Sequence, residues 1–414
     1  MGKCTCGVDI IEISRIRDAI VKNDRFCERI FTGSELDYFQ KHGSRIETLA
    51  GFFAAKEAFS KYLGTGIRGF EFHDIEIGHD ELGEPFVIFR NRKIDVSLSI
   101  SHNTDTAVAV VCGEVSELSG CNIDIKYREK MRKLIPFRSE DANKGDCGRV
   151  FIIAGSKGMT GAATLCGYGA LRCGSGLVTV GTAASEQSIL ACKLTEAMTV
   201  ALPCNDGVLS HEAIDLIKTY AERADVVAIG PGLGRNEDIK KILSELIKIY
   251  EKTLIVDADG INALSENIDI LKEKRCEIIL TPHPGEMSRL TGLSVEEIQT
   301  NRERLAAEFA IGYGVCVVLK GKDTVIADKD GKISVNPTGN SGMATGGTGD
   351  VLCGVIAAFA AQGLSPYDAA VLGTYIHGLA GDIALQKKGI HGLIASDVAD
   401  SLPESIIITN SEKL

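Results

Sequence analysis

The chain has 414 residues, of which 45 are basic and 56 are acidic, so its formal net charge is −11. At roughly 150 residues per domain, this length predicts two or three domains. The hydrophobic share of 44% is ordinary for a folded protein and excludes a disordered or collagen-like chain. The acidic balance disfavours a general nucleic-acid binder, and no run approaches the roughly 18 apolar residues of a membrane span.

The thirteen cysteines are irregularly spaced and form no Cys-x-x-Cys pair. Such a pattern is typical of thiols in a reducing compartment rather than of a disulfide scaffold. The apolar residues near the start are interrupted by Asp9 and Glu12, so they do not read as a secretory signal. We therefore expect a cytoplasmic protein with free thiols.

The first 115 or so residues predict an α+β domain. Residues 7–13 alternate loosely and predict a strand, and residues 45–63 have the apolar spacing of a long helix that ends at Gly64. Four further runs predict strands in two consecutive pairs: residues 72–77 with 85–89, and 96–100 with 107–111.

A strand, a glycine-bearing loop and a helix then alternate from residue 149 onward. Short apolar runs predict strands at residues 150–154, 178–181, 226–229, 254–256, 278–280 and 315–319. Amphipathic helices are expected at residues 239–250 and 295–310. Continuous apolar strands between helices indicate a largely parallel sheet covered on both faces, which binds ligands at the carboxyl ends of its strands. The expected organisation is a domain at 1–118, a charged linker and approach segment at 119–142, and an α/β domain at 143–408.

Two carboxylates and a lysine stand out in the first part. Asp9 interrupts an apolar strand, while Glu57 and Lys61 lie four residues apart and share one face of a helix. Carboxylates from two elements suit Mg²⁺, and a nearby lysine can hold a phosphate. The same spacing also fits a turn residue and an ordinary helix ion pair, and spacing alone leaves both interpretations open.

The amino-acid sequence of these passages resembles that of the holo-acyl-carrier-protein synthases. The similar passages are residues 7–16, 31–36, 53–61 and 97–102, in the order of that family. The resemblance implies that the 4′-phosphopantetheine arm of coenzyme A is transferred to a serine of an acyl carrier protein. It also implies that Asp9 and Glu57 hold Mg²⁺ on the pyrophosphate. Lys61 would neutralise a phosphate or assist the leaving group.

The same resemblance places coenzyme A against Lys61, Gly64 and His102. Acyl carrier proteins are acidic, so arginines of the first helix, Arg15 and Arg25, are the expected docking residues. The small core of such a domain, together with the trimeric assembly of the family, predicts a homo-oligomer with threefold symmetry through this part of the chain.

Glycines surround one aspartate in the second part. The run at residues 336–350 ends in Gly-Thr-Gly-Asp and enters an apolar helix, which makes an anion site from free backbone N–H groups. Asp350 at this point is either a helix cap or a base. No Gly-Lys-Ser/Thr occurs, and Gly-Pro-Gly-Leu-Gly at 230–234 lacks the dinucleotide spacing, so a Walker loop and a hydride-transfer enzyme are both disfavoured.

The Gly-Thr-Gly-Asp pattern resembles ribokinase-like phosphotransferases. More closely, residues 130–405 resemble the ADP-dependent NAD(P)H-hydrate dehydratases, in passages that run from Lys144-Gly145 to Asp350. The resemblance implies an α/β ribokinase-like fold and repair of nicotinamide cofactors hydrated at C6. ADP would phosphorylate the unwanted hydroxyl, and loss of phosphate would restore NADH or NADPH, leaving AMP.

Within this resemblance Asp350 is the base that activates the hydroxyl, in contact with the hydrate. The residues implied for the nucleotide are Lys320, Gly321, Lys322, Asp323, Thr324 and Gly349. The residues implied for the NAD(P)H hydrate are Ala162, Ala163, Gly232, Gly234 and His283, with the choice between the two alanines and between the two glycines open.

Two alternatives remain at this point. The second domain fits a ribokinase-like kinase of a vitamin or sugar, and the first fits a non-catalytic assembly module. Cofactor recovery with ADP separates the first pair of hypotheses, and measured pantetheine transfer separates the second.

Overall fold

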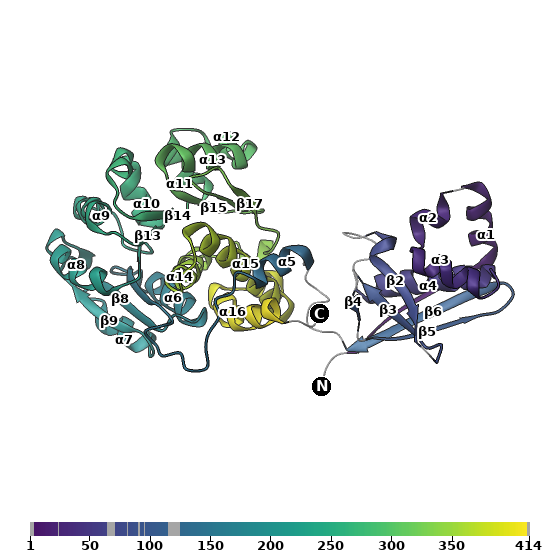
Figure 1. Cartoon of the computed structure of the whole chain (residues 1–414). Coiled ribbons are helices and arrows are strands. Elements are labelled where there is room, and N and C mark those ends of the chain that lie inside the picture. Colours follow the sequence, from purple (N-terminus) through teal and green to yellow (C-terminus); the bar gives the residue numbers. More distant parts are fainter. Residues whose placement is uncertain are drawn as a thin grey trace. The chain divides into compact units, whose positions relative to one another are not determined.

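A computed structural model of the chain describes residues 4–23, 25–63, 71–80, 82–89, 92–94, 96–114 and 125–411 (Figure 1). These fall into two compact units, one before Ile125 and the other covering Ile125–Ser411. The finer limits expected for the two domains and the linker stay predictions. In the described residues no helix is long and apolar enough to cross a membrane.

The first unit is an α+β fold in which helices come early and strands late. Its helices are α1 (Ile13–Lys22), α2 (Phe26–Ile30), α3 (Gly33–Lys41) and α4 (Ile46–Tyr62). Its strands are β1 (Cys4–Glu12), β2 (Ile75–His79), β3 (Pro85–Phe89), β4 (Arg92–Lys93), β5 (Ser97–His102) and β6 (Thr106–Glu114). They form two antiparallel sheets, β1-β6-β5 and β2-β3-β4.

Helix α4 is the core of this unit. It is buried on most of its circumference, as a helix with apolar residues all round must be. Strand β1 comes very close to it, because a Cβ on Gly7 would lie 2.0 Å from the carbonyl oxygen of Ala58. Glycine at position 7 therefore lets β1 lie against α4, which brings the next residues of the strand to the helix surface.

Three expectations from the sequence differ from the structure. Residues 72–74 form a short 3₁₀ turn rather than a strand, because the carboxylates of Glu71 and Asp74 cap it reciprocally. The helix expected at 295–310 is two helices, because Asn301 leaves helical geometry with φ −128° and ψ 38°. Free thiols were expected throughout, yet Cys6 and Cys112, which face each other in register on β1 and β6, form a disulfide.

The second unit is built on a nine-stranded sheet. The strand order is β17-β16-β15-β14-β13-β12-β7-β8-β9, parallel from β15 to β9 and antiparallel at the β16 and β17 edge. The bounds are β7 (Arg149–Ile153), β8 (Leu177–Ala183), β9 (Met198–Leu202), β12 (Val226–Ile229), β13 (Thr253–Val256), β14 (Glu277–Leu280), β15 (Cys316–Leu319), β16 (Val325–Ala327) and β17 (Ile333–Val335). A small hairpin, β10 (Cys204–Asn205) with β11 (Val208–Leu209), stands apart.

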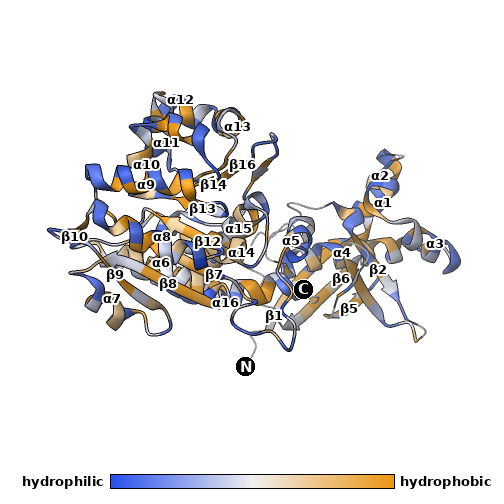
Figure 2. Ribbon diagram, turned by 60° about the vertical axis from the view of Figure 1, so that its left-hand side comes forward, coloured by the Kyte–Doolittle hydropathy of each residue, from blue (hydrophilic) through white to orange (hydrophobic). Residues whose placement is uncertain are grey.

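Helices cover both faces of this sheet (Figure 1). One layer consists of α8 (Ile214–Arg223), α9 (Glu237–Ile249), α10 (Ala258–Ser265), α11 (Pro284–Thr291), α12 (Val295–Thr300) and α13 (Arg302–Tyr313). The other contains α5 (Ile125–Arg132), α6 (Thr160–Arg172), α14 (Thr348–Ala361), α15 (Pro366–Gly392) and α16 (Ala395–Asn410), and α7 (Gln187–Lys193) lies beside β9. In Figure 2 the strands are largely hydrophobic, while α9 and α10 carry residues of both kinds. The sequence-based expectation of a parallel sheet between two helical layers is confirmed.

The parallel strands also place the second site. The carboxyl ends of β7, β12, β13, β14 and β15, which are adjacent in the sheet, all lie at one edge. The polar residues that follow these strands therefore meet, as the general rule for such sheets requires.

Candidate active sites

The first site forms where β1 runs beside α4. The Lys61 ammonium donates to the Asp9 carboxylate at 2.7 Å and to the Val8 carbonyl at 3.1 Å. Burial raises the pKa of Glu57, and the nearby Asp9 carboxylate raises it further, while Lys61 opposes the shift. The structure therefore brings Asp9, Glu57 and Lys61 together, as the sequence analysis expected.

The remaining residues expected for this site are placed only in part. His102 is exposed at the end of β5, and the strand register sets it two residues along from the rung that Asp9 occupies. Gly64 lies outside the described residues. Both Arg15 and Arg25 are exposed, but Arg25 is not on the first helix. That helix ends at Lys22, and the Asn23 side chain accepts a hydrogen bond from the Arg25 backbone N–H at 3.0 Å, so the chain turns before α2.

The second site is centred on a half-buried lysine, Lys320. Lys320 follows β15, and its ammonium donates at 2.8 Å to the carboxylate of Asp257, which follows β13, two strands away in the sheet. It also lies 3.9 Å from a carboxylate oxygen of Glu286. Burial lowers the pKa of Lys320, but the Asp257 and Glu286 carboxylates outweigh it and the pKa is raised. The lysine is therefore a fixed positive charge.

Asp350 completes this cluster from the start of α14. Burial raises its pKa to about 7, with further increases from Asp257, Asp259 and Glu286 that Lys320 only partly offsets. The helix cap is Gly347, with φ +94°, so Asp350 is the third residue of the helix and not its cap. Its carboxylate makes no hydrogen bond to the residues that the structure describes. It is a half-buried carboxylate available to a ligand.

Lys320 and the start of α14 lie in contact. A Cβ on Gly349 would come within 3.4 Å of the Lys320 ammonium, so the lysine and the first N–H groups of α14 border one space. Ammonium and helix N-terminus both attract an anion. Of the other residues expected for the nucleotide, Gly321, Lys322 and Asp323 are exposed in the loop that follows.

Arg302 holds the loop that follows β15 in place. Its guanidinium donates to the carbonyls of Leu319 at 2.8 Å and Lys320 at 3.4 Å. Thr324 is buried and donates to the Gly321 carbonyl at 2.8 Å, which closes the turn. The sequence analysis gave no role to Arg302, and no local pattern marks it.

His283 caps the helix that Glu286 lies on. Its Nδ1 accepts from the backbone N–H groups of Gly285 at 2.9 Å and Glu286 at 3.3 Å. The Glu286 carboxylate in turn accepts from the His283 N–H at 2.7 Å. Since Nδ1 is an acceptor, the ring proton of the neutral form is on Nε2. Burial lowers the His283 pKa and the cations Lys320 and Arg289 lower it further, so the neutral form is favoured.

The other residues expected for the hydrate come from the loop after β12, which contains Gly232 and Gly234, and from α6, which contains Ala162 and Ala163. A Cβ on Gly232 would lie 2.8 Å from the Ala162 Cβ, so these two are in contact, while Ala163 is fully buried against Gly155. The Gly234 N–H donates to Asp259 at 2.9 Å. Ala162 is thus the more accessible of the two alanines, and both glycines belong to one loop.

Three features of this site were not foreseen. Ala258, between Asp257 and Asp259, has φ +46°, a strained conformation for a residue with a side chain. Thr281 and His377 are buried, and neither the Thr281 hydroxyl nor the His377 Nε2 has a partner among the described residues. Burial lowers the His377 pKa to about 4, so this histidine under the start of α14 is neutral. Strain and unsatisfied polar atoms gather where a ligand is expected.

Comparisons with known proteins agree with this division. A family model described as NAD(P)H-hydrate dehydratase matches residues 150–404, and one described as the 4′-phosphopantetheinyl transferase superfamily matches residues 5–112. The ADP-dependent (S)-NAD(P)H-hydrate dehydratase of Bacillus subtilis is 34% identical, over 68% of this chain and 97% of its own length. A bifunctional NAD(P)H-hydrate repair enzyme of Moorella thermoacetica is 45% identical over 66% of this chain, which spans about half, 52%, of that relative.

Solved structures resemble the second unit. The ADP/ATP-dependent NAD(P)H-hydrate dehydratase of B. subtilis, crystallised with ATP and Mg²⁺, has 32% identity and a TM-score of 0.60, covering 70% of this chain and 99% of that one. A ribokinase-like superfamily protein from Enterococcus faecalis has 31% identity and a TM-score of 0.58, covering 68% of this chain and 94% of that one. The second unit therefore has the ribokinase-like fold.

Proposed function

Because this chain belongs to the NAD(P)H-hydrate dehydratase family through residues 150–404, we propose that its second unit restores hydrated NADH and NADPH with ADP as phosphoryl donor. The observation that carries the proposal is the half-buried Asp350 carboxylate beside Lys320 and the start of α14. An activating base and a phosphate-binding site thus adjoin one space.

The nucleotide would lie on the loop after β15. The ammonium of Lys320 and the N–H of Gly349 would hold the phosphoryl group being transferred. The residues from Gly321 to Thr324 would hold the rest of ADP. Arg302 would keep the loop in place through its bonds to the Leu319 and Lys320 carbonyls. These contacts keep a positive charge next to the phosphoryl group throughout the transfer.

The reaction would then proceed in two steps. Asp350 takes the proton of the hydroxyl on C6 of the hydrated ring, and the oxygen attacks the β-phosphorus of ADP. The bond from that phosphorus to AMP breaks, and AMP leaves with the electron pair. The ring nitrogen then expels phosphate from C6, and loss of a proton from C5 restores the double bond. A carboxylate with a pKa of about 7 suits the first step, because about half of it is ionised at neutral pH and it is a better base than an ordinary aspartate.

The hydrate would be held between two loops. His283 can donate from Nε2, because its Nδ1 is occupied by the N–H groups of α11. On the other side, Gly232 and Gly234 present backbone without side chains, with Ala162 against Gly232. These contacts leave room for a ring that must approach Asp350 closely.

Incubation of the full chain with hydrated NADH tests this proposal. We expect restored NADH, AMP and phosphate in equal amounts when ADP is present and no restoration without a nucleotide. ATP serves as the comparison. A kinase of a vitamin or sugar would leave the hydrate unchanged and consume ATP with its own substrate, and that result would overturn the proposal.

We propose a second activity for the first unit, transfer of 4′-phosphopantetheine from coenzyme A to a serine of an acyl carrier protein. The family match to residues 5–112 supports it. So does the arrangement of Asp9, Glu57 and Lys61 on two adjoining elements, β1 and α4. Lys61 would neutralise a phosphate of coenzyme A and His102 would contact the same ligand, while the exposed Arg15 and Arg25 would meet the acidic carrier.

The two carboxylates of this unit fit Mg²⁺. Asp9 raises the pKa of Glu57, so the two are close enough to repel, and a divalent cation would offset that repulsion. No group of three or more metal-binding side chains occurs among the described residues, so phosphates and water would supply the other ligands. Mg²⁺ would polarise the phosphoanhydride, and Lys61 would leave Asp9 for the substrate phosphate.

The first unit also has a surface suited to self-association. Val8 and Ile10 are 50% and 66% exposed on the outer face of β1. Adjacent exposed apolar side chains on a strand mark an interaction site. We propose that they form part of a homo-oligomer interface with threefold symmetry. Light scattering at micromolar concentration tests it: a trimer is expected for the wild type, and a monomeric mass would contradict the proposal.

A further inference from the structure

A pocket of about 190 Å³ opens beside the proposed hydrate site. Its lining includes Gly234, Asp259 and Asn262 and the two arginines Arg235 and Arg289. The pocket therefore lies between the loop after β12, the start of α9 and the two helices α10 and α11. None of these residues except Gly234 has a role in the proposed reaction.

The pocket adjoins the hydrate contacts on both sides. Gly234 lines it directly, and Arg289 is on α11, the helix that His283 caps. Arg289 is near enough to His283 to affect the ring, whose pKa it lowers together with burial and Lys320. A ligand that contacts Gly234 and His283 would therefore extend naturally into this pocket.

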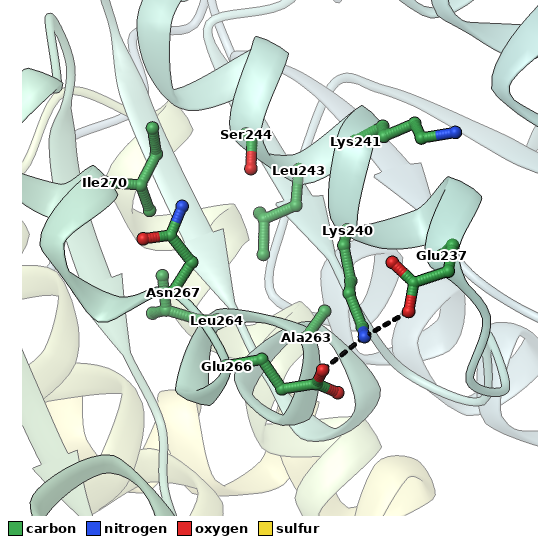
Figure 3. A pocket seen from close by; sticks show the side chains of 10 residues that line it. All are labelled: Glu237, Lys240, Lys241, Leu243, Ser244, Ala263, Leu264, Glu266, Asn267 and Ile270. Atoms are coloured by element: carbon green, nitrogen blue, oxygen red, sulfur yellow. Dashed lines mark hydrogen bonds and ion pairs between the residues drawn. The ribbon is translucent and has the colours of Figure 1, made fainter.

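Most charges around the pocket are already paired. The Lys240 ammonium is held between the carboxylates of Glu237, at 2.6 Å, and Glu266 (Figure 3). Asp259 accepts from the Gly234 N–H at 2.9 Å and from the Asn262 amide at 3.2 Å. The Lys240 charge is thus neutralised by two carboxylates, and the Asp259 oxygens already accept hydrogen bonds from the protein.

The two arginines differ from them. The Arg235 side chain is 67% exposed, and its single ion-pair contact, with Asp259, is long at 3.5 Å. Arg289 is exposed and forms no ion pair with the described residues. The pocket thus has one guanidinium that interacts with Glu286 only beyond ion-pair distance and a second that has one contact at 3.5 Å. Guanidinium groups bind phosphate through paired N–H donors.

A neighbouring pocket of about 410 Å³ offers no such charge. It shares Lys240, Ala263 and Glu266 with the first. Its other cation, Lys241, pairs with Asp238 at 3.5 Å and points away from the Lys240 pair (Figure 3). An anion would therefore prefer the smaller pocket beside Arg289.

We propose that the smaller pocket binds a phosphate group of the dinucleotide, with Arg289 as its main partner and Arg235 as the second. The inference rests on the proposed repair of hydrated NAD(P)H. Two phosphates of the substrate have this chemistry: the pyrophosphate, common to both hydrates, and the ribose phosphate, present in NADPH hydrate alone.

Steady-state kinetics on the full chain distinguish the two sources. Arg289→Ala should lower kcat/KM for the hydrate by about 10- to 100-fold, mainly through KM, because one charge-assisted pair is lost. An equal loss for both hydrates assigns the pocket to the pyrophosphate, and a loss confined to NADPH hydrate assigns it to the ribose phosphate. Arg289→Lys should recover part of the loss, and Arg235→Ala should have a smaller effect.

The control is Arg223→Ala, which replaces an exposed arginine at the end of α8 outside the pocket. It should leave kcat/KM unchanged for both hydrates. The KM for ADP should stay constant in all variants. Unchanged kcat/KM for both hydrates in Arg289→Ala, or a raised KM for ADP instead, would overturn the inference while leaving the repair activity in place. A wild type that repairs neither hydrate would overturn the proposed function itself.

Discussion

Each unit contains a lysine paired with a buried carboxylate, and the two pairs differ in what surrounds them. In the first unit Lys56 and Glu35 are 2.7 Å apart and both are 0% exposed. The lysine also donates to the carbonyls of Ile30 and Phe72, and the carboxylate accepts from the N–H groups of Thr32 and Ile77. Every group has a partner within the protein, and no part of the pair is available to a ligand.

The second pair, Lys320 with Asp257, is not closed in this way. Two further carboxylates, Glu286 and Asp350, lie close to it, and burial raises the pKa of each to about 7. The carboxylates of both pairs are buried, so burial alone does not identify a catalytic charge. Where all partners of a lysine are satisfied, the ion pair serves to position helices. Where a lysine is surrounded by more carboxylates than it can pair with, the site is a candidate for ligand binding.

Asp350→Asn should have the largest effect. We expect repair to slow by about 10²–10⁴-fold, because asparagine cannot accept the hydroxyl proton. Phosphopantetheine transfer should not change. The pKa of Asp350 is raised in the folded state from 3.8 to about 7, so the folded state loses stability relative to the unfolded chain as the pH rises from about 4 to about 7. The variant should therefore be as stable as the wild type at low pH and somewhat more stable above pH 7.

Unfolding curves and both activity assays measure these outcomes, with the exposed Asp330→Asn as a matched control. If Asp350→Asn retains most of its repair rate, the base must be sought elsewhere. If it loses both activities while folded, the two units do not act independently.

Lys56→Ala should have the next largest effect and the opposite distribution. It leaves the Glu35 carboxylate buried without its ion partner, which typically costs about 3–5 kcal/mol of stability. We expect a lower unfolding midpoint of the first unit and reduced pantetheine transfer, with repair unchanged. The double replacement Glu35→Leu with Lys56→Met should recover much of the stability. A fully stable single variant would show that the pair does not hold α3 to α4.

Asp9→Ala should abolish one ligand of the proposed Mg²⁺ site. Changes beside metal ligands already cost about 10–100-fold, so a direct ligand should cost at least about 100-fold in pantetheine transfer. Raised Mg²⁺ should recover some activity, and repair should stay normal. Asp18→Ala, an exposed aspartate on α1, is the control. Equal losses of both activities in Asp9→Ala would contradict the separation of the two sites.

Local patterns in the sequence predicted much of this. The rule that ligands bind at the ends of parallel strands predicted where His283 and Lys320 lie, because that rule depends only on topology. The i and i+4 spacing of Glu57 and Lys61 predicted a shared helix face, and Asp9, which the family resemblance grouped with them, contacts Lys61. These predictions needed nothing beyond neighbours along the chain and the order of the strands.

Other features could not be predicted in this way. Lys56 and Glu35 are on different helices, and nothing local shows that two charges will be buried together. Arg302 acts on carbonyls of a distant loop, and the neutral His377 lies under α14 only because α15 packs there. The Cys6–Cys112 disulfide depends on the register of β1 against β6. Long-range packing decides each of them.

The pH dependence of repair tests the central claim, that Asp350 is a base held ready by buried carboxylates. For the wild type, kcat/KM should rise with pH through an inflection near 7 and fall about tenfold per pH unit below it, because the base must be ionised. Since Glu286 also has a pKa of about 7, the inflection belongs to the coupled pair. Glu286→Gln should move it to lower pH by removing one repelling charge. The inflection should be absent in Asp350→Asn. A wild-type profile that is flat between pH 5 and about 8, or an inflection that persists in Asp350→Asn, would contradict the account.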